Sequence, residues 1–371
     1  MFAQFGVGSD GFQGFFEDTA GSWNSDAWAV YLDVEEEVTD QWTVGVAMRY
    51  ESYDDFDDST DWKLSTRYDF TDSLAVRATA NTAFRAPSPG QVNTLNVTTS
   101  ANSAGELIPS GTYPVDNPVA RVLGSTDVGS EESLAYTLGL VWTPGERWSV
   151  TLDYYNIEID DRIAVATAII DERNVADLNA MGFPNADVLL GSSASYFTNG
   201  FDTEVSGIDL AVGSWWEMGE GIISADLRYN YNEQKIRDVI DGAIGPDRVY
   251  DLENQVPEES AVFTLDYSSD ALAGLVRVNY YGDWSTTDGI FGDGTADTTQ
   301  TYGSEVLVDV ELSYTFLENY TVAVGGENIF DEYPDKETGF VASEVFGVEY
   351  AITSPFGLNG AFWYARLAAS F

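Results

Sequence analysis

Hydrophobic and polar residues alternate along much of the chain, with the period of two that is typical of a β-strand. In residues 306–316, every even position is apolar, whereas the odd positions include Asp309 and Glu311. Residues 42–50 and 223–231 show the same alternation. The pattern therefore predicts strands that have one apolar face and one polar face.

The alternation predicts about 13 strands of roughly a dozen residues, most of them in pairs. They are 24–37, 41–53, 60–70, 74–86, 132–143, 148–161, 199–213, 221–235, 258–267, 271–284, 304–316, 320–332 and 359–371. Strands that cross a membrane need roughly 9–11 residues, and extensions beyond the bilayer are common. The lengths thus favour strands in lipid.

The connections between these strands are of two kinds, and the two kinds alternate. Short turns are predicted at 38–40, 71–73, 144–147, 268–270 and 317–319, with a somewhat longer one at 214–220. Long loops are predicted at 87–131, 162–198, 236–257, 285–303 and 333–358, and the brief acidic segment 54–59 is the exception on that side. Short turns on one side and long loops on the other are typical of outer-membrane barrels.

The last predicted strand runs to the end of the sequence, at Phe371. In water a free strand with one apolar face is an aggregation hazard, but in lipid such a strand closes a barrel. The first strand starts on the long-loop side and so does the last, which requires an odd number of strands. We therefore expect an all-β, antiparallel transmembrane β-barrel that is only the C-terminal portion of a larger one. Residues 1–23 would be a partial extracellular loop and 24–371 the barrel portion.

Composition narrows the function classes. Aromatic residues make up 14% of the chain, which suits the aromatic girdles of a membrane barrel. There is no cysteine and no histidine, so thiolate metal sites, disulfides and histidine-based catalysis are excluded. No apolar run is long enough for a transmembrane helix, and the first residues do not resemble a signal peptide. We expect neither an enzyme nor a bound cofactor.

The net charge is −46, from 62 acidic and 16 basic residues. Such a chain repels nucleic acid, which we exclude as a partner. Extreme acidity is typical of a solvated surface and suits a marine or saline habitat.

Four motifs follow one another in a characteristic order. Phe84, Arg85, Ala86 and Pro87 form F-R-A-P at the top of a strand. Further along are D-Y-Y-N-I at 153–157, E-N-I-F-D-E-Y-P at 327–334 and S-P-F-G-L-N-G at 354–360. Together these stretches resemble those of TonB-dependent outer-membrane receptors, over residues 24–371.

The resemblance implies active uptake through a barrel of about 22 strands. On this reading the chain holds about 13 of them, and the plug domain and the N-terminal part that contacts the TonB energy-transducing complex are missing. The implied substrate is a small molecule or metal chelate: a ferric siderophore first, or cobalamin, haem or an oligosaccharide. Outer-membrane lipid, lipopolysaccharide and the barrel-assembly machinery would be the other partners, the last through the C-terminal strand. The implied location is the outer membrane of a Gram-negative bacterium.

The motif residues also have structural interpretations. Pro87 ends strand pairing because proline has no N–H to donate. Asn328 and Asp331 of the E-N-I-F-D-E-Y-P motif can bond local backbone where a strand meets a loop. The set of family motif residues is Phe84, Arg85, Ala86, Pro87, Asn328, Phe330, Asp331, Tyr333 and the terminal aromatic Phe371. Ala369 departs from the larger residue that is common in the family.

Alternation also assigns charges to the polar face, where they would line the lumen. The predicted lumen-facing residues are Arg49, Arg77, Arg85, Arg228, Asp153, Asp226, Asp309 and Glu311. Acids and bases on this face nearly balance, so a wall of paired charges with no role in substrate binding is the simpler hypothesis.

The densest acidic cluster lies at the short outer segment and consists of Asp54, Asp55, Asp57, Asp58 and Asp61. Oxygen-only clusters can bind Ca²⁺, although no EF-hand spacing is present and a solvated loop is the ordinary alternative. Loops 87–131 and 162–198 are the best candidates for substrate contact, because of their length and location.

Three other functions remain open at this stage. A passive porin would share the barrel but lack a plug. An acidic, soluble, β-rich binding protein would share the strands but not the lipid. A carboxylate-only hydrolase is conceivable without histidine.

Overall fold

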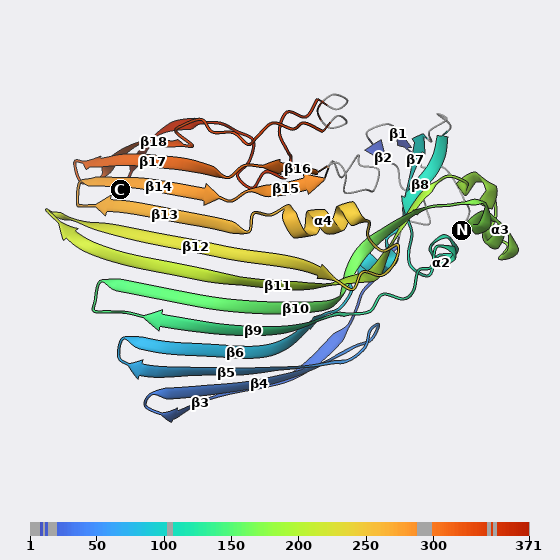
Figure 1. Cartoon of the computed structure of the whole chain (residues 1–371), viewed down its shortest axis with the longest axis horizontal. Helices are drawn as coiled ribbons and strands as arrows, with labels where there is room; N and C mark the ends of the chain where they lie inside the picture. The colour runs from blue at the N-terminus through green and yellow to red at the C-terminus, as the bar shows by residue number, and fades with distance from the viewer. Residues whose placement is uncertain are drawn as a thin grey trace.

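Thirteen strands form one antiparallel sheet in which neighbours in sequence are mostly neighbours in space (Figure 1). The computed structural model describes residues 8–9, 12–13, 21–101, 107–287, 299–339, 343 and 347–370. In order across this sheet the strands are β3 (Ala27–Thr39), β4 (Trp42–Tyr53), β5 (Ser59–Thr71), β6 (Leu74–Arg85), β9 (Glu131–Trp142), β10 (Trp148–Ile169), β11 (Ser193–Met218), β12 (Gly221–Arg237), β13 (Glu259–Ser268), β14 (Leu272–Tyr281), β17 (Glu305–Phe316), β18 (Tyr320–Glu327) and β19 (Phe362–Ala369).

Each of these strands matches one of the thirteen predicted from alternation. Most ends differ by only a few residues, but β10 and β11 are 22 and 26 residues long and continue well past the predicted limits of 161 and 199. All the short turns lie at the left end of the sheet in Figure 1 and the long loops at its right end. The predicted division into short turns and long loops is confirmed.

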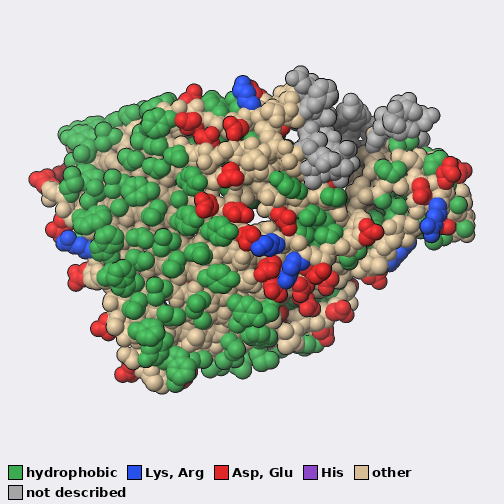
Figure 2. Space-filling model, in the orientation of Figure 1, with side chains coloured by type: hydrophobic (Ala, Val, Ile, Leu, Met, Phe, Trp, Pro, Cys, Tyr) green, Lys and Arg blue, Asp and Glu red, His purple; other side chains and the backbone are tan. Residues whose placement is uncertain are grey.

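The strand register gives the sheet one apolar and one polar face. Residues paired across antiparallel strands share a face, so Leu138 lies beside Ala78 and Tyr154 on the apolar side. Hydrophobic side chains cover this side in Figure 2. Leu138 is 55% exposed, which would be costly in water but is the normal situation of a side chain that faces lipid.

Aromatic side chains of the apolar face gather near the two ends of the strands. At the short turns, the Trp148 and Trp216 rings are 5.8 Å apart in an edge-to-face contact, and at the loop end Trp28 and Tyr50 are 5.3 Å apart. From Trp42 to Tyr50 along β4 is about 26 Å at the usual rise per residue. This span matches the apolar band of roughly 25 Å between the girdles of a membrane barrel. The turn-end girdle contains Trp42, Tyr68, Trp142, Trp148, Trp216, Phe316 and Tyr320.

The long loops contain ordered structure that alternation did not predict. Loop 87–131 contains α1 (Pro89–Asn93), β7 (Asn96–Ala101), β8 (Leu107–Thr112) and α2 (Pro118–Val122). The other loops contain α3 (Glu172–Ala180), the 3₁₀ helix η2 (Ala186–Leu189), α4 (Pro246–Asn254) and the hairpin β15 (Trp284–Thr287) and β16 (Thr299–Tyr302). No described helix is both long and apolar enough to cross a bilayer.

The sheet has two free edges. Among the described residues, β3 pairs only with β4 and β19 only with β18, so the barrel is not closed. Of the predicted partial loop 1–23, the structure describes little more than the strands β1 (Gly8–Ser9) and β2 (Phe12–Gln13). The predicted terminal aromatic, Phe371, lies outside the described residues.

The lipid-facing assignment predicts that two positions on opposite faces of β9 differ in how much a charge destabilises the protein. Leu138→Arg places a charge near the middle of the apolar band and should destabilise the membrane-inserted protein by about 2–4 kcal/mol. Ala135→Arg, on the polar face of the same strand, should cost much less. Urea unfolding in lipid vesicles measures both, and equal losses would contradict the assignment.

Candidate functional site

The eight charges predicted to face the lumen all lie on the polar face of the sheet. Across the strands, Asp153 of β10 lies opposite Gly139 of β9, which lies opposite Arg77 of β6. On the same face, Asp309 of β17 lies opposite Arg277 of β14. The register also places further acids on this face that the predicted near balance did not count: Asp61, Asp209, Glu131, Asp266 and Glu305. Acids therefore outnumber bases on the polar face.

Arg77 and Asp153 form an ion pair that spans an intervening strand. Nε and Nη2 of Arg77 in β6 donate to the two carboxylate oxygens of Asp153 in β10, at 2.9 and 2.7 Å. The pair crosses β9 directly above Gly139, where a Cβ atom would overlap the Asp153 carboxylate and the Arg77 side chain. A glycine is thus required at that position for the two charges to meet.

The same arrangement recurs near the C-terminal edge. Tyr364 of β19 donates its hydroxyl hydrogen to Glu311 of β17 at 2.7 Å, and Arg366 donates to the same carboxylate at 2.9 Å. The Tyr364 ring lies over Gly325 of β18, where a Cβ atom would overlap it. Each of these bridges joins strands that share no backbone hydrogen bonds.

Other predicted charges of the polar face differ in whether they have a partner. Arg49 pairs with Glu51, and Asp309 accepts from the Asn279 side chain at 3.0 Å and from the backbone N–H of Asn328 at 2.9 Å. Within the described chain, Asp226 and Arg228 form no ion pair within 4.0 Å.

The F-R-A-P motif anchors the outer ends of three strands. Arg85 donates to Glu131 at 2.8 Å, and the same carboxylate oxygen accepts the backbone N–H of Ile163 at 2.8 Å. Glu131 is only 7% exposed, so these two donors stabilise a buried charge. Phe84 packs edge-to-face on Tyr53, with ring centroids 5.6 Å apart. Ala86 and Pro87 follow, where the strand ends.

The E-N-I-F-D-E-Y-P motif at 327–334 forms a compact turn after β18. Asn328 adopts a left-handed conformation with φ of 48°, and its side chain bonds both the carbonyl and the N–H of Glu332. Asp331 accepts the N–H of Ala361, just before β19, at 2.8 Å, and Tyr333 stacks on Tyr350. The motif therefore holds the last loop against the last strand. Phe330 is 65% exposed.

The acidic outer segment does not assemble into a metal site. Asp58 accepts the hydroxyl hydrogen of Tyr50 at 2.6 Å, and Asp61 that of Ser59 at 3.0 Å. No group of three or more acidic side chains in the described chain has an arrangement that could hold a metal ion. The candidate Ca²⁺ ligands Asp54, Asp55, Asp57, Asp58 and Asp61 are not brought together.

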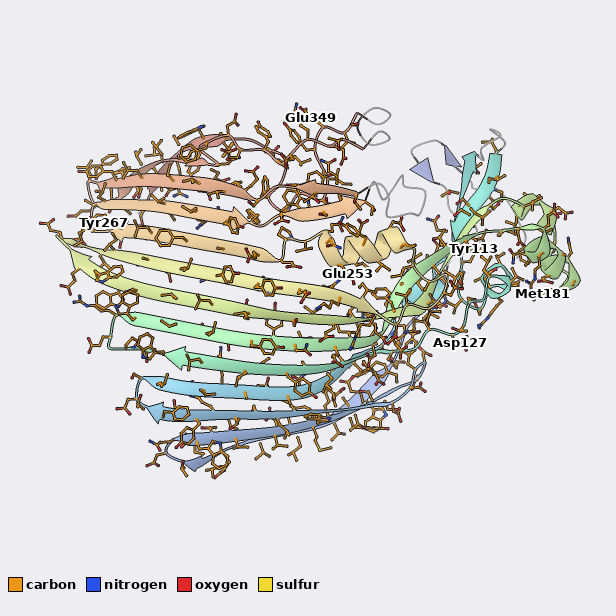
Figure 3. The ribbon with its side chains drawn as sticks, viewed as in Figure 1. Tyr113, Asp127, Met181, Glu253, Tyr267 and Glu349 are labelled. Atoms are coloured by element: carbon orange, nitrogen blue, oxygen red, sulfur yellow. The ribbon has the colours of Figure 1, made fainter. Side chains whose placement is uncertain are left out.

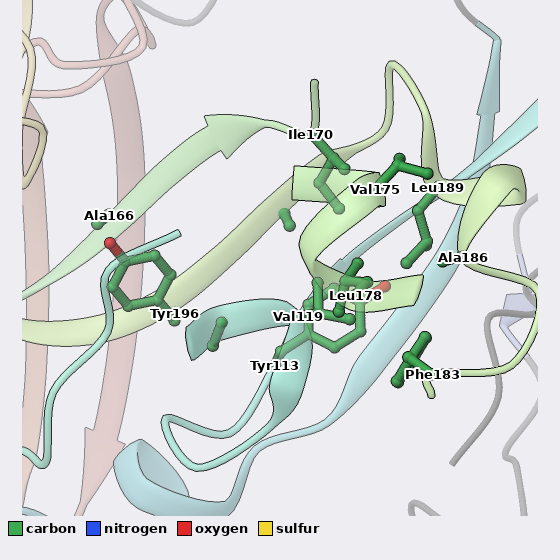
Figure 4. Close-up of a cluster of buried hydrophobic side chains, with 12 residues drawn as sticks. Tyr113, Val119, Ala166, Ile170, Val175, Leu178, Phe183, Ala186, Leu189 and Tyr196 are labelled. Carbon is green, nitrogen blue, oxygen red and sulfur yellow. The ribbon is translucent and has the colours of Figure 1, made fainter. Parts of the chain in front are cut away.

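The two loops chosen as substrate-contact candidates fold together into one unit, here called the cap: residues 107–127 and 163–198. Its hydrophobic core includes Val119 of α2, Leu178 of α3 and Leu189 of η2, each at most 1% exposed (Figure 4). Burial raises the pKa of Tyr113, also in this core, to about 12. The cap lies beyond the loop end of the sheet, where Figure 3 marks Tyr113 and Met181, opposite Tyr267 near the short turns.

The cap is joined to the sheet through β10 and β11, which continue from the membrane band into the cap. Their pairing is shifted between Ile159 and Ile163, where Asp161 has a φ of 56°. The Asn199 side chain stabilises this bulge by donating to the carbonyls of Asp161 and Gly129, at 2.6 and 3.1 Å. Beyond the bulge, β8 adds to β11 in parallel.

A second ordered group joins three other loops. Asp251 of α4 is 7% exposed and accepts hydrogen bonds from the backbone and hydroxyl of Thr287 and from the hydroxyl of Thr286. Trp284 stacks on Tyr302, with centroids 5.0 Å apart, and Phe356 from the last loop packs edge-on against Trp284. These contacts cross-link the three loops to one another. None of these contacts was predicted, because each depends on residues that are far apart in sequence.

A family model described as "TonB dependent receptor-like, beta-barrel" matches residues 3–329. The chain belongs to this family. The family comprises receptors and transporters of the Gram-negative outer membrane, not enzymes. The predicted resemblance and the predicted fold class are both confirmed.

Individual relatives agree with this assignment. The vitamin B12 transporter BtuB of Photobacterium profundum is 26% identical over 315 residues, which are 84% of this chain and 40% of the transporter. The ferric enterobactin receptor PfeA of Pseudomonas aeruginosa has a similar fold, with a TM-score of 0.65 and 15% identity over 94% of this chain and 45% of that receptor. The siderophore receptor PirA of Acinetobacter baumannii gives 0.65 and 17%, over 94% and 46%. The chain therefore spans less than half the length of these TonB-dependent receptors.

The Arg77–Asp153 ion pair above Gly139 predicts that the stability of the barrel is sensitive to a single methyl group at this glycine. Gly139→Ala should push Arg77 and Asp153 apart and destabilise the barrel by about 1–3 kcal/mol, the usual cost of overpacking. Gly274→Ala in β14 is the control, because its Cβ would meet only Leu312 and Glu311 of β17, at ordinary contact distances of 3.7 and 3.8 Å. Urea unfolding in lipid compares them, and an equal response would show that the bridge does not depend on the glycine.

The cap core predicts a local effect that leaves the barrel intact. Leu178→Ala should destabilise the cap by about 2–5 kcal/mol, since it opens a cavity in a fully buried site. Hydrogen exchange should then accelerate in 107–127 and 163–198 but not in β12 to β14. Met181→Ala, three residues on and 63% exposed, should leave the exchange unchanged. Faster exchange throughout the sheet would mean that the cap is not a separate unit.

Proposed function

We propose that this chain is the C-terminal part of the barrel of a receptor that takes up a scarce nutrient across the outer membrane. A ferric siderophore is the first candidate class, and cobalamin, haem and oligosaccharides are the others. Transport would be driven by the TonB energy-transducing complex, through an N-terminal part outside this chain. The proposal rests on one observation above all: residues 3–329 match the family's barrel, and twelve of the thirteen strands of the described sheet lie within that match, in chain order.

The ordered outer loops support uptake of a bulky nutrient. The outer loops form a cap with its own core, and the polar face carries fixed charges below it. Loops held in place in advance lose little conformational entropy when they bind, which favours affinity for a rare ligand. The vitamin B12 and siderophore receptors among the relatives support the substrate classes.

Features of the surface and of the last strand support the other proposed partners. The apolar band and its aromatic girdles would contact outer-membrane lipid and lipopolysaccharide, and β19 would present the strand that barrel-assembly machinery recognises. The net charge of −46 supports a saline habitat, because salt screens repulsion between surface acids.

Uptake measurements test the proposed function directly. The complete receptor that contains residues 1–371 is expressed in a Gram-negative strain without its own siderophore and cobalamin receptors. Labelled ferric siderophores or cobalamin should accumulate in these cells, and accumulation should fall to background when the energy transducer is deleted. Accumulation that persists without the transducer, together with steady conductance in planar bilayers, would indicate a passive channel. Extraction of the receptor without detergent would indicate a soluble binding protein.

A further inference from the structure

The S-P-F-G-L-N-G motif at 354–360 ends in an asparagine that is followed directly by glycine. The chain contains two such pairs, Asn199-Gly200 and Asn359-Gly360. In an Asn-Gly pair the backbone nitrogen of glycine can attack the side-chain carbonyl carbon of asparagine, because glycine has no Cβ to hinder the approach and an unrestricted backbone. In a folded protein the reaction requires that the asparagine side chain and the backbone beside it are free to meet.

The first pair is held in place by its surroundings. The Asn199 side chain accepts the N–H of Gly129 at 2.7 Å, in addition to its two bonds to the carbonyls of Gly129 and Asp161. Gly200 is buried within β11, and its carbonyl accepts the N–H of Ile240 at 2.8 Å. All three hydrogen bonds of the Asn199 side chain would have to break before it could turn toward the nitrogen of Gly200.

The second pair has no comparable restraint. Asn359 is exposed and lies outside the strands and helices, between Gly357, which has a φ of 82°, and the start of β19 at Phe362. Within the described chain its side chain forms no hydrogen bond. The side-chain carbonyl of Asn359 is therefore free to rotate toward the nitrogen of Gly360, in a segment that no strand pairing fixes.

The product of the reaction would alter the junction between the last loop and the last strand. Gly360 lies against the Tyr333 hydroxyl and the Asp331 carboxylate, and a Cβ atom at this glycine would overlap both. Asp331 also accepts the N–H of Ala361 at 2.8 Å. An isoaspartate at 359 adds a methylene group to the main chain and a negative charge next to Gly360, so it should weaken both contacts.

We propose that Asn359 is a site of spontaneous modification, at which the chain converts this asparagine into aspartate and isoaspartate. A bond forms between the nitrogen of Gly360 and the side-chain carbonyl carbon of Asn359, the amide proton passes to the solvent, and the carboxamide nitrogen leaves as ammonia. Water then opens the cyclic imide at one or the other carbonyl, which gives the two products. The modification is a property of the chain itself and is independent of the proposed uptake function.

Peptide mass spectrometry tests the proposal on the complete receptor that contains residues 1–371, purified in detergent and aged in mildly alkaline buffer. A methyltransferase specific for isoaspartate distinguishes the two products. Conversion at Asn359 should be at least about tenfold faster than at Asn199, whose three hydrogen bonds must break first. In receptor unfolded by urea the two rates should be similar, because neither pair is then restrained. Asn185, which is also exposed but is followed by Ala186, is the matched control and should remain unmodified over the same period.

Hydrogen exchange measures the effect on the junction. In aged receptor, exchange in residues 328–332 and at Ala361 should be several-fold faster than in fresh receptor. N359Q should show neither conversion nor faster exchange, because glutamine would have to close a larger ring. Equal rates at Asn359 and Asn199 in the folded receptor would overturn the proposal, as would an unreactive Asn359 in folded receptor whose unfolded form reacts. Conversion without faster exchange would overturn the effect on the junction.

Discussion

Backbone hydrogen bonding in lipid is the constraint on which this structure depends. The bilayer core offers no water to pair with an exposed N–H or carbonyl, so each spanning residue must find its partner on the next strand. In the described chain this requirement is met by an unbroken series of antiparallel pairs from β3 to β19. The placement of every side chain follows from that register, because a slip of one residue would move all side chains of a strand to the opposite face.

The same constraint explains why the strands could be predicted from sequence and the cap could not. Lipid on one side and water on the other impose a strict alternation, which residues 306–316 display without reference to any other segment. The cap has no such local pattern. Its helices α2 and η2 have five and four residues, too few to show a helical period. Their order comes from local hydrogen bonds such as that of the Asn117 side chain and from a core shared between two loops.

Part of the candidate site could be predicted from the sequence, for a related reason. Alternation places a charge on the polar face, so the shared face of Arg77 and Asp153 could be predicted from each strand alone. Their pairing could not, because the two residues are 76 positions apart and meet only across a third strand, above a glycine. The prediction that acids and bases nearly balance on the polar face was wrong, because acids such as Asp209 and Asp266 were left out when faces were assigned strand by strand.

The long ribbon formed by β10 and β11 has a mechanical consequence. Two hydrogen-bonded strands resist stretching and bend most easily where their pairing is interrupted. Here the interruption lies between Ile159 and Ile163, between the apolar band and the cap core. A force applied to the cap would therefore be transmitted along the ribbon to the two short turns that precede β10 and follow β11, and the ribbon would bend at Asp161, beside the Asn199 side chain.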